Sequence, residues 1–300
     1  MKYDVIVAGD YYLDLIFSGL PGFPELGKEI VGSGFEMIAG GAFNAAIAMH
    51  RLGLKVGWAA DFGDDDLSRW VLERVLAEGL DDALFVRHRR PMRRITVSIS
   101  YPEDRAFVTY VDPEATPPAA LKALAKTSAW ALYLPGFYHG PFLSAGLTIV
   151  RAKRMRLIMD GNSSEEVRLA EPSVRQAVHS VDVFMPNASE ARRITGQADL
   201  AQAIRALADV CPLVVVKDGA SGAHAYADGQ VRHSPAIPVT PIDTTGAGDC
   251  FNAGFIKAWF EGLPLDECLR WGNVVGGLST LAHGGAGKAI TPDEVRRWLK

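Results

Sequence analysis

Short apolar runs alternate with segments of helical periodicity along most of the chain. The first run, Tyr3–Gly9, is nearly continuous and ends at a glycine, which is typical of a buried parallel strand. Residues Ala42–Gly53 then have the apolar spacing of a helix that stops at glycine. Later strand-like runs each end in Gly, Pro or Asn: KVGWAADFG, AWALYLPG, RLIMDGN, VDVFMPN and LVVVKDG. This alternation predicts an α/β fold with a mostly parallel central sheet flanked by helices, and with ligands bound outside the carboxyl ends of its strands.

Two segments interrupt the alternation, at about residues 15–38 and 93–111. Neither has helical periodicity, and the second is typical of two strands joined by a turn at Pro102–Asp104. We interpret the two segments as a small β lid over the site, the alternative being an edge hairpin without a role. Because the chain has no repeat, low-complexity tract or linker, we expect residues 1–300 to form a single domain that carries this lid.

Composition narrows the class of protein. The chain of 300 residues is 48% apolar and 22% charged, which is enough apolar material for a large core. Its formal net charge of −4 gives no electrostatic footprint for nucleic acid, and no apolar stretch approaches the roughly 18 residues of a membrane span. The three cysteines have neither metal-site nor disulfide spacing. Asp10 and Asp14 interrupt the N-terminal apolar run, which is therefore unlike the apolar region of a signal peptide. We therefore expect a cytoplasmic protein that binds neither nucleic acid nor membrane.

The sequence DTTGAGDCF, which starts at Asp243, is the strongest candidate for chemistry. Its glycine-rich turn leads into an apolar segment with helical spacing, so the turn is predicted to lie at a helix N-terminus. Backbone amides there lack intrahelical partners and lie at the positive end of the helix dipole, which favours an anion. The amides of Gly246, Ala247 and Gly248, with the carboxylate of Asp249, suit phosphoryl transfer, in which an enzyme positions the reactants and neutralises charge.

Two common phosphate-binding motifs are absent from the sequence. The segment Gly284–Ala289 lacks the first glycine of a Walker A loop, because position 282 is Ala, and it lacks a Ser or Thr after Lys288. The turn at Gly246 lacks the third glycine of a dinucleotide fingerprint, because position 251 is Phe. A nucleotide would therefore be bound in another way. Cys250 is interpreted as a packing residue at a helix start.

Glycines and an amide before the first long helix are candidates for ligand contact. Gly40 and Gly41 allow close approach of a ligand, and Asn44 offers a donor and an acceptor to a polyol. A glycine pair before a helix is more often a simple turn. Asp10 and Asp14 follow the first strand, at the rim where ligands bind in such sheets.

Candidate groups also follow the later strands. Asn187 and Glu190 are placed to face a metal-bound phosphate through water, with a helix cap as the equal alternative for Asn187. Gly219 and Gly222 punctuate a strand end and are placed to pass close to a nucleotide. The basic segment Arg87–Arg94 is typical of a solvated face, the alternative being a site for the phosphate of a phosphorylated substrate.

Together these motifs resemble a known family. DTTGAGDCF is similar to the C-terminal signature of the ribokinase (PfkB) family of carbohydrate kinases, and GGAFNAA is similar to its N-terminal glycine motif. Asn187-x-x-Glu190 and Lys217-x-Gly219-x-x-Gly222 follow in the family's order and spacing, so the resemblance covers nearly the whole chain. It implies a ribokinase-like three-layer fold, whose small β lid closes over the sugar and often forms the contact of a homodimer.

The resemblance also implies a reaction and a set of site residues. The reaction is transfer of the γ-phosphate of ATP to a primary hydroxyl of a sugar or nucleoside, with Mg²⁺ and, as a further candidate, K⁺. Asp249 would be the general base, and the anion hole would be formed by Gly246, Ala247 and Gly248. The positions implied to hold substrate hydroxyls are Asp14, Gly40, Gly41 and Asn44. Those implied to bind ATP are Asn187, Lys217, Gly219, Gly222 and Asn273. The implied metal positions are Glu190 for Mg²⁺, through water, and Asp243 with Thr245 for a monovalent cation whose loop is completed within residues 279–288.

Three positions depart from the pattern of a typical family member. Lys217 stands where a small hydroxyl residue is common, which bears on contact with the phosphates, and Ala42 occupies a position that ribokinase fills with Lys. Residues Met159–Glu166 replace an Asn-Tyr-Arg type of sequence found in several ketose and keto-acid kinases. These differences weaken a prediction of ribose, fructose or 2-keto-3-deoxygluconate and leave the reaction type untouched. Two alternatives stay open: a phosphosugar kinase that uses the Arg87–Arg94 cluster, and a catalytically silent sugar or nucleotide sensor on the same fold.

Overall fold

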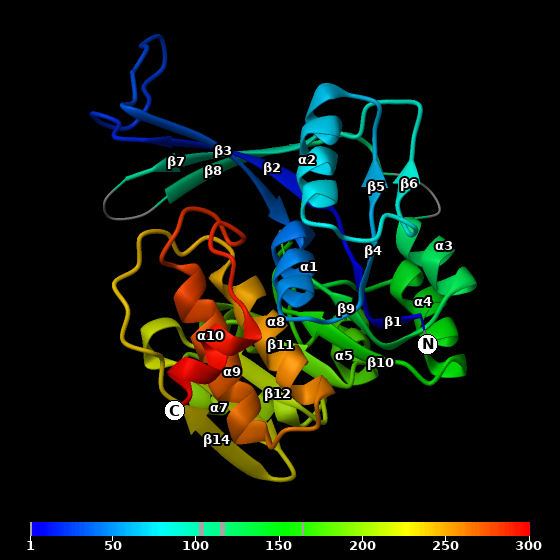
Figure 1. Ribbon diagram of the computed structural model, residues 1–300. Helices are drawn as coiled ribbons and strands as arrows, with labels where there is room; N and C mark the ends of the chain where they lie inside the picture. The colour runs from blue at the N-terminus through cyan, green and yellow to red at the C-terminus, as the bar shows by residue number, and fades with distance from the viewer. Residues whose placement is uncertain (1, 102–104, 115–117, 164) are drawn as a thin grey trace.

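The computed structural model describes residues 2–101, 105–114, 118–163 and 165–300 (Figure 1). An eight-stranded sheet lies at its centre, with the parallel strands neighbouring one another and two antiparallel strands at one edge. From that edge the strands are β14 (Gln230–Ser234), β13 (Ala223–Ala227), β12 (Val214–Lys217), β11 (Val183–Met185), β10 (Arg156–Asp160), β9 (Ala129–Leu134), β1 (Tyr3–Ala8) and β4 (Val56–Ala59).

Both faces of this sheet are buried, which explains the continuous apolar runs of its parallel strands. In β1, Val5 and Val7 lie in one core and Ile6 and Ala8 lie in the other, because successive side chains of a strand point to opposite faces. The helices of the first core are α1 (Ala42–Arg51), α8 (Ala247–Phe260), α9 (Leu265–Ser279) and α10 (Pro292–Trp298), with α2 (Asp66–Ala77) beside them. Those of the second are α3 (Ala119–Lys126), α4 (Pro141–Ala152), α5 (Pro172–Ser180), α6 (Ala188–Thr195) and α7 (Leu200–Ala208). The predicted α/β architecture of a mostly parallel sheet between two helical layers is confirmed.

A second sheet of four strands lies at the top of Figure 1, apart from the central sheet. Its order is β3 (Gly34–Gly41), β2 (Tyr11–Ser18), β7 (Arg94–Ser100) and β8 (Arg105–Val111). We call it the lid sheet. Its strands come from the two segments that interrupt the alternation of the sequence, although β2 begins four residues before the predicted boundary at residue 15. The turn predicted at 102–104 lies outside the described residues.

Short elements complete the fold. A two-stranded parallel sheet joins β5 (Asp61–Phe62) to β6 (Val86–Arg87), and a single 3₁₀ turn, η1 (Gly219–Ser221), follows β12. Among the described residues, none of the helices has the length and apolarity needed to cross a membrane. The cysteines Cys211, Cys250 and Cys268 are all buried as free thiols, as expected for Cys250 from its position at a helix start.

Candidate active site

The N-terminus of α8 forms a cradle of backbone amides. Gly246 precedes the helix with φ 70°, a left-handed conformation that glycine adopts readily, and Ala247 begins the first turn. A Cβ atom at position 246 would lie 2.7 Å from Nδ2 of Asn44 and 2.6 Å from Cα of Gly285. Position 246 therefore accommodates only glycine, and the turn it forms orients the backbone amides of Ala247 and Gly248. We call the Gly246–Gly248 turn the phosphoryl cradle.

Asp249 lies in the first turn of α8, directly after this cradle. Asn44 Nδ2 donates a hydrogen bond of 3.4 Å to its Oδ2 atom. Burial, with the nearby Asp160 carboxylate as a smaller cause, raises the pKa of Asp249 to about 7 against the opposing effect of Lys217. A carboxylate with a pKa near neutrality is suited to accept a proton at physiological pH, because a general base works best when its pKa matches the operating pH.

Asn44 is buried in α1 and lies against the cradle, 3% exposed. Its Oδ1 atom has no hydrogen-bond partner among the described residues, whereas its Nδ2 atom is directed at Asp249. A buried amide oxygen without a donor is unfavourable unless a ligand supplies one. This arrangement fits the prediction that Asn44 meets a substrate hydroxyl beside the base.

The glycines before α1 lie against two aspartates of the β1–β2 region. Gly41 has φ 64°, and a Cβ atom there would lie 2.7 Å from the backbone oxygen of Asp10. A Cβ atom at Gly40 would overlap the carboxylate of Asp14. Burial and, to a smaller extent, the Asp243 carboxylate raise the pKa of Asp14 to about 6 against the opposing effect of a hydrogen bond from Thr96. The structure thus brings together the predicted substrate residues on the lid side of Asp249.

Asn187 and Glu190 form a capping box at the start of α6. The Asn187 Oδ1 atom accepts from the Glu190 amide at 2.8 Å, and the Glu190 Oε2 atom accepts from the Asn187 amide at 2.7 Å. The helix-cap interpretation of Asn187 is therefore present in the structure. Glu190 lies close to the end of β10, since a Cβ atom built on Gly161 would be 2.9 Å from its Oε2 atom. Burial and the Asp160 carboxylate raise its pKa.

Asp160, Lys217 and Asn252 form a buried polar cluster beside the cradle. Lys217, the last residue of β12, places its Nζ atom 2.6 Å from Oδ2 of Asp160, the last residue of β10. Asn252, in α8, accepts from Lys217 Nζ at 3.4 Å and donates to Asp160 Oδ2 and to the hydroxyl of Tyr133. Because β10, β11 and β12 are parallel neighbours, their carboxyl ends bring these groups together.

Sequence reasoning missed Asp160, Asn252 and Tyr133. A signal existed for Asp160, which is a carboxylate directly after the buried strand RLIM. Asn252 lies one turn after Asp249 on the same helix, a spacing that places both side chains on one face. Neither signal gives the partner, because that depends on the order of the strands in the sheet.

The predicted nucleotide residues lie around the end of β12. Gly219 has φ 55° and Gly222 has φ 94°, and a Cβ atom at 222 would overlap the backbone oxygen of Ser234. Asn273 is buried in α9, where Nδ2 donates to the carbonyls of Ser234 and Pro235 at 2.9 and 3.0 Å. This amide therefore holds the end of β14 in place, next to the glycine turn.

Asp243 ties the two predicted halves of the cation loop together. Its Oδ1 atom accepts from the amide and hydroxyl of Thr245, at 2.9 and 2.7 Å, and its Oδ2 atom accepts from the Gly284 amide at 2.8 Å. Residues 243–245 and the segment around Gly284 are thus neighbours. This juxtaposition is what the predicted loop requires.

Comparison with known proteins decides the family. The model of the pfkB family carbohydrate kinase matches residues 15–292, which is most of the chain. This chain belongs to that family. It is therefore an ATP-dependent kinase with an alcohol acceptor of the sugar or nucleoside type, as the sequence predicted.

Relatives with several acceptors resemble this kinase. It is 30% identical to the cytidine kinase of Thermococcus kodakarensis over 90% of the chain and 93% of that protein. It is 26% identical to the ribokinase of Bacillus subtilis, with 99% of both chains covered. The structure of Arabidopsis thaliana ribokinase, complexed with ribose and ATP, superposes with a TM-score of 0.83 at 21% identity, covering 100% of this chain and 99% of that one.

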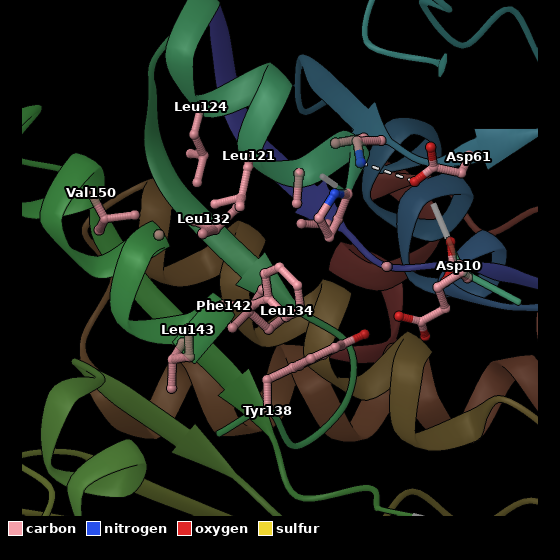
Figure 2. A pocket seen from close by; sticks show the side chains of 18 of the residues that line it. Asp10, Asp61, Leu121, Leu124, Leu132, Leu134, Tyr138, Phe142, Leu143 and Val150 are labelled. Atoms are coloured by element: carbon pink, nitrogen blue, oxygen red, sulfur yellow. Dashed lines mark hydrogen bonds between the residues drawn. The ribbon is translucent and has the colours of Figure 1, made fainter. Parts of the chain in front are cut away.

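An apolar cavity of ≈ 170 Å³ has Asp10, which follows β1, among its lining residues (Figure 2). Leu121, Leu124 and Leu132 line its inner part, between α3, α4 and β9. At its other end, Figure 2 shows the Tyr138 hydroxyl directed toward the side where Asp10 lies. Burial raises the pKa of Asp10 to about 6 against the opposing effect of Arg94.

The Arg87–Arg94 cluster of the kinase does not act as one unit. Arg87 pairs with Asp82 at 2.9 Å, and Arg93 pairs with Asp112 at 2.9 Å. Arg94 is buried and pairs with Asp10 at 3.0 Å. These arginines already have carboxylate partners in three places, so the cluster gives no support to a shared phosphate site.

Proposed function

We propose that this kinase transfers the γ-phosphoryl group of ATP to a primary hydroxyl of a sugar or nucleoside, with Asp249 as the general base. The observation that carries the proposal is a carboxylate with a pKa of about 7 that directly follows a glycine-built cradle of amides. The base and the site for developing negative charge thus lie within the same helical turn.

The reaction follows from these positions. The acceptor hydroxyl donates to Asp249, and its oxygen forms a bond to the γ-phosphorus as the bond from that phosphorus to the ADP oxygen breaks. The hydroxyl proton passes to the Asp249 carboxylate. The amides of the phosphoryl cradle receive the charge on the moving phosphoryl group, at the positive end of the α8 dipole.

The chain's own residues fit the proposed cations. Mg²⁺ prefers oxygen ligands and keeps several waters, and Glu190 offers a buried carboxylate beside the cradle. When bound, Mg²⁺ neutralises charge on the phosphates. Among the described residues, no group of three or more His, Cys, Asp or Glu side chains is arranged as a metal site. Asp243 and Thr245, joined to the Gly284 segment, are the proposed monovalent-cation residues.

Within the acceptor class we favour a nucleoside over a free sugar, and the support is similarity to a cytidine kinase. Tyr138, at the end of the Figure 2 cavity toward Asp10, provides a ring face and a hydroxyl for a base that reaches this side. The phosphosugar alternative has less support, because Arg93 and Arg94 are paired with carboxylates and Arg90 donates to backbone carbonyls. A silent sensor has no use for a base beside the cradle.

We also infer a cytoplasmic homodimer formed through the lid sheet. Its edge strand β8 carries Phe107 and Val108, which are 59% and 65% exposed. Exposed apolar residues on an edge strand favour pairing with a second copy. Three buried free thiols accord with a reducing compartment.

The acceptor is tested with the purified kinase, ATP and Mg²⁺. Cytidine, other nucleosides, ribose, fructose and sugar phosphates are compared by direct detection of the phosphorylated product. We expect a nucleoside to give the highest kcat/KM and Tyr138→Ala to lower it about tenfold for that nucleoside only. Preference for a free sugar, unaffected by Tyr138→Ala, would remove the nucleoside assignment and leave the kinase intact.

A further inference from the structure

Side chains from β10 and α8 meet a single lysine at the end of β12. The Lys217 side chain is 11% exposed, and its ammonium group contacts Asp160 at 2.6 Å and Asn252 at 3.4 Å. Asp160 is 4% exposed and Asn252 is fully buried. Asp160 Oδ1 also accepts from the Asn162 amide at 2.9 Å, so its carboxylate is held on both oxygens. A lysine side chain fixed by two buried partners has lost most of its usual freedom.

The fixed ammonium group faces the phosphoryl cradle. A Cβ atom built on Gly248 would lie 3.7 Å from Nζ and from Cε of Lys217, the nearest atoms outside the adjoining backbone of α8. The Lys217 ammonium group therefore lies next to the space that a side chain at position 248 would occupy. A positive charge at this wall is placed to meet a phosphoryl group held by the amides of residues 246–248.

We propose that Asp160 and Asn252 are positioning residues that hold the Lys217 ammonium group at the wall of the phosphoryl cradle, where it contacts the transferred phosphoryl group. The inference deepens the proposed function and rests on it. Lys217 then acts as a built-in cation for the γ-phosphate. Asp160 holds the ammonium group in place through the ion pair, and Asn252 contacts both partners and is itself held by its hydrogen bond to Tyr133.

The same unit acts on the base. Several groups face Asp249: Asp160 at the end of β10, Glu190 in α6, Lys217 at the end of β12, Asn44 in α1 and Tyr133 in β9. Asp160 and Glu190 raise the pKa of Asp249, and Lys217 and Asn44 lower it. Burial raises the pKa of Tyr133 well above its usual value, so this phenol stays neutral. Removing either charge of the Asp160–Lys217 pair therefore moves the pKa of Asp249, in opposite directions.

The first test measures binding without turnover. Calorimetry with Mg²⁺ measures the affinity of each protein for ADP and for the non-hydrolysable analogue AMP-PNP. The proteins are the wild-type enzyme and the variants Lys217→Met, Asp160→Asn and Asn252→Leu. Lys217→Met should weaken AMP-PNP about 10- to 100-fold and ADP less than threefold, because a charge-assisted contact to the γ-phosphate is lost. The other two variants should lose part of the same preference. An unchanged ratio of the two affinities in Lys217→Met overturns the contact, and an unchanged ratio in both partner variants overturns the positioning role.

The second test uses the pH dependence of kcat/KM. Relative to the wild-type enzyme, the acidic limb should move to higher pH in Lys217→Met and to lower pH in Asp160→Asn, because Asp249 loses a positive and a negative neighbour respectively. Asn252→Leu changes no charge and should leave the limb in place. If the ion pair has only a structural role, the acidic limbs of the wild-type enzyme and all three variants should coincide. If the limbs of Lys217→Met and Asp160→Asn moved in the same direction, the electrostatic account would be contradicted.

Matched variants control for folding. Lys257→Met removes another ion-paired lysine whose side chain is also 11% exposed, in the last turn of α8 and far from the cradle. It should leave the affinity ratio and the pH profile unchanged. Lys217→Arg keeps the charge and should retain most of the AMP-PNP preference. If the wild-type enzyme phosphorylated no acceptor, the proposed function would fail, while the calorimetric ratios would still decide whether Lys217 meets the γ-phosphate.

Discussion

Replacing Asp249 with Asn should stabilise the protein at alkaline pH, because the structure holds this carboxyl where its charge is unfavourable. Its pKa is raised from 3.8 to about 7, chiefly by burial. At 1.36 kcal/mol per pKa unit, the difference amounts to about 4 kcal/mol for a site sealed from water. Asp249 keeps partial access to solvent, so we halve this to about 2 kcal/mol. For a chain of this length that corresponds to about 3 °C in the unfolding midpoint.

The sign of the pH dependence follows from the raised pKa. Below pH 3.8 the carboxyl is protonated in both the folded and the unfolded state, so the charge has no effect. As pH rises toward 7, the unfolded state releases its proton first and is favoured. The advantage of Asp249→Asn should therefore be greatest at pH 8 and fall to less than half at pH 5. Active-site groups that are costly for stability are common in enzymes.

Thermal unfolding of the two proteins without ligand, at pH 5 and pH 8, provides the assay. Asp266→Asn is the matched control, because Asp266 also lies in the first turn of a helix but has a side chain 57% exposed. It should change the midpoint by less than 1 °C at either pH. If Asp249→Asn gave no gain at pH 8, or the same gain at both pH values, the reasoning on buried charge at Asp249 would be refuted.

Three further predictions concern activity and assembly. The acidic limb of kcat/KM for the wild-type enzyme should lie near pH 7, and a limb near pH 4 would show that Asp249 is not the titrating base. Gly246→Ala should lower kcat about 100-fold with ADP affinity nearly unchanged, because a Cβ there displaces the cradle against Asn44; normal kcat would contradict the cradle. Val108→Glu should shift the sedimentation of the protein from dimer to monomer, and an unaltered dimer would exclude the β8 edge.

The central sheet could be predicted because burial on both faces leaves a simple pattern. Strands such as β1 and β9 are continuous apolar runs that end at the site. The antiparallel strands β13 and β14 were missed, because AHAYA and QVRHS are short and mix polar with apolar residues. The early start of β2 was missed because Tyr11 and Leu13, although buried, belong to the lid sheet and continue the apolar character of β1.

The candidate site also contains residues that could be predicted from the sequence and residues that could not. Gly246 and Asp249 were accessible from sequence, because glycine spacing before a helix has a direct backbone meaning. The ion pair of Asp160 with Lys217 was not accessible, because the two residues are 57 positions apart and meet only through the strand order. Asn187 was ambiguous for a different reason: a cap and a ligand use the same amide group, and only the hydrogen bonds of the capping box show the cap.

The most direct test of the central claim compares wild-type and Asp249→Asn enzymes in one experiment. Each is mixed with ATP, Mg²⁺ and the best acceptor of the panel, and both bound ligands and phosphorylated product are measured in a single turnover. The account predicts that Asp249→Asn binds ATP and acceptor within about threefold of the wild-type affinities and forms product at least 100-fold more slowly. Product formation at a near-normal rate by Asp249→Asn would contradict the assignment of Asp249 as the base.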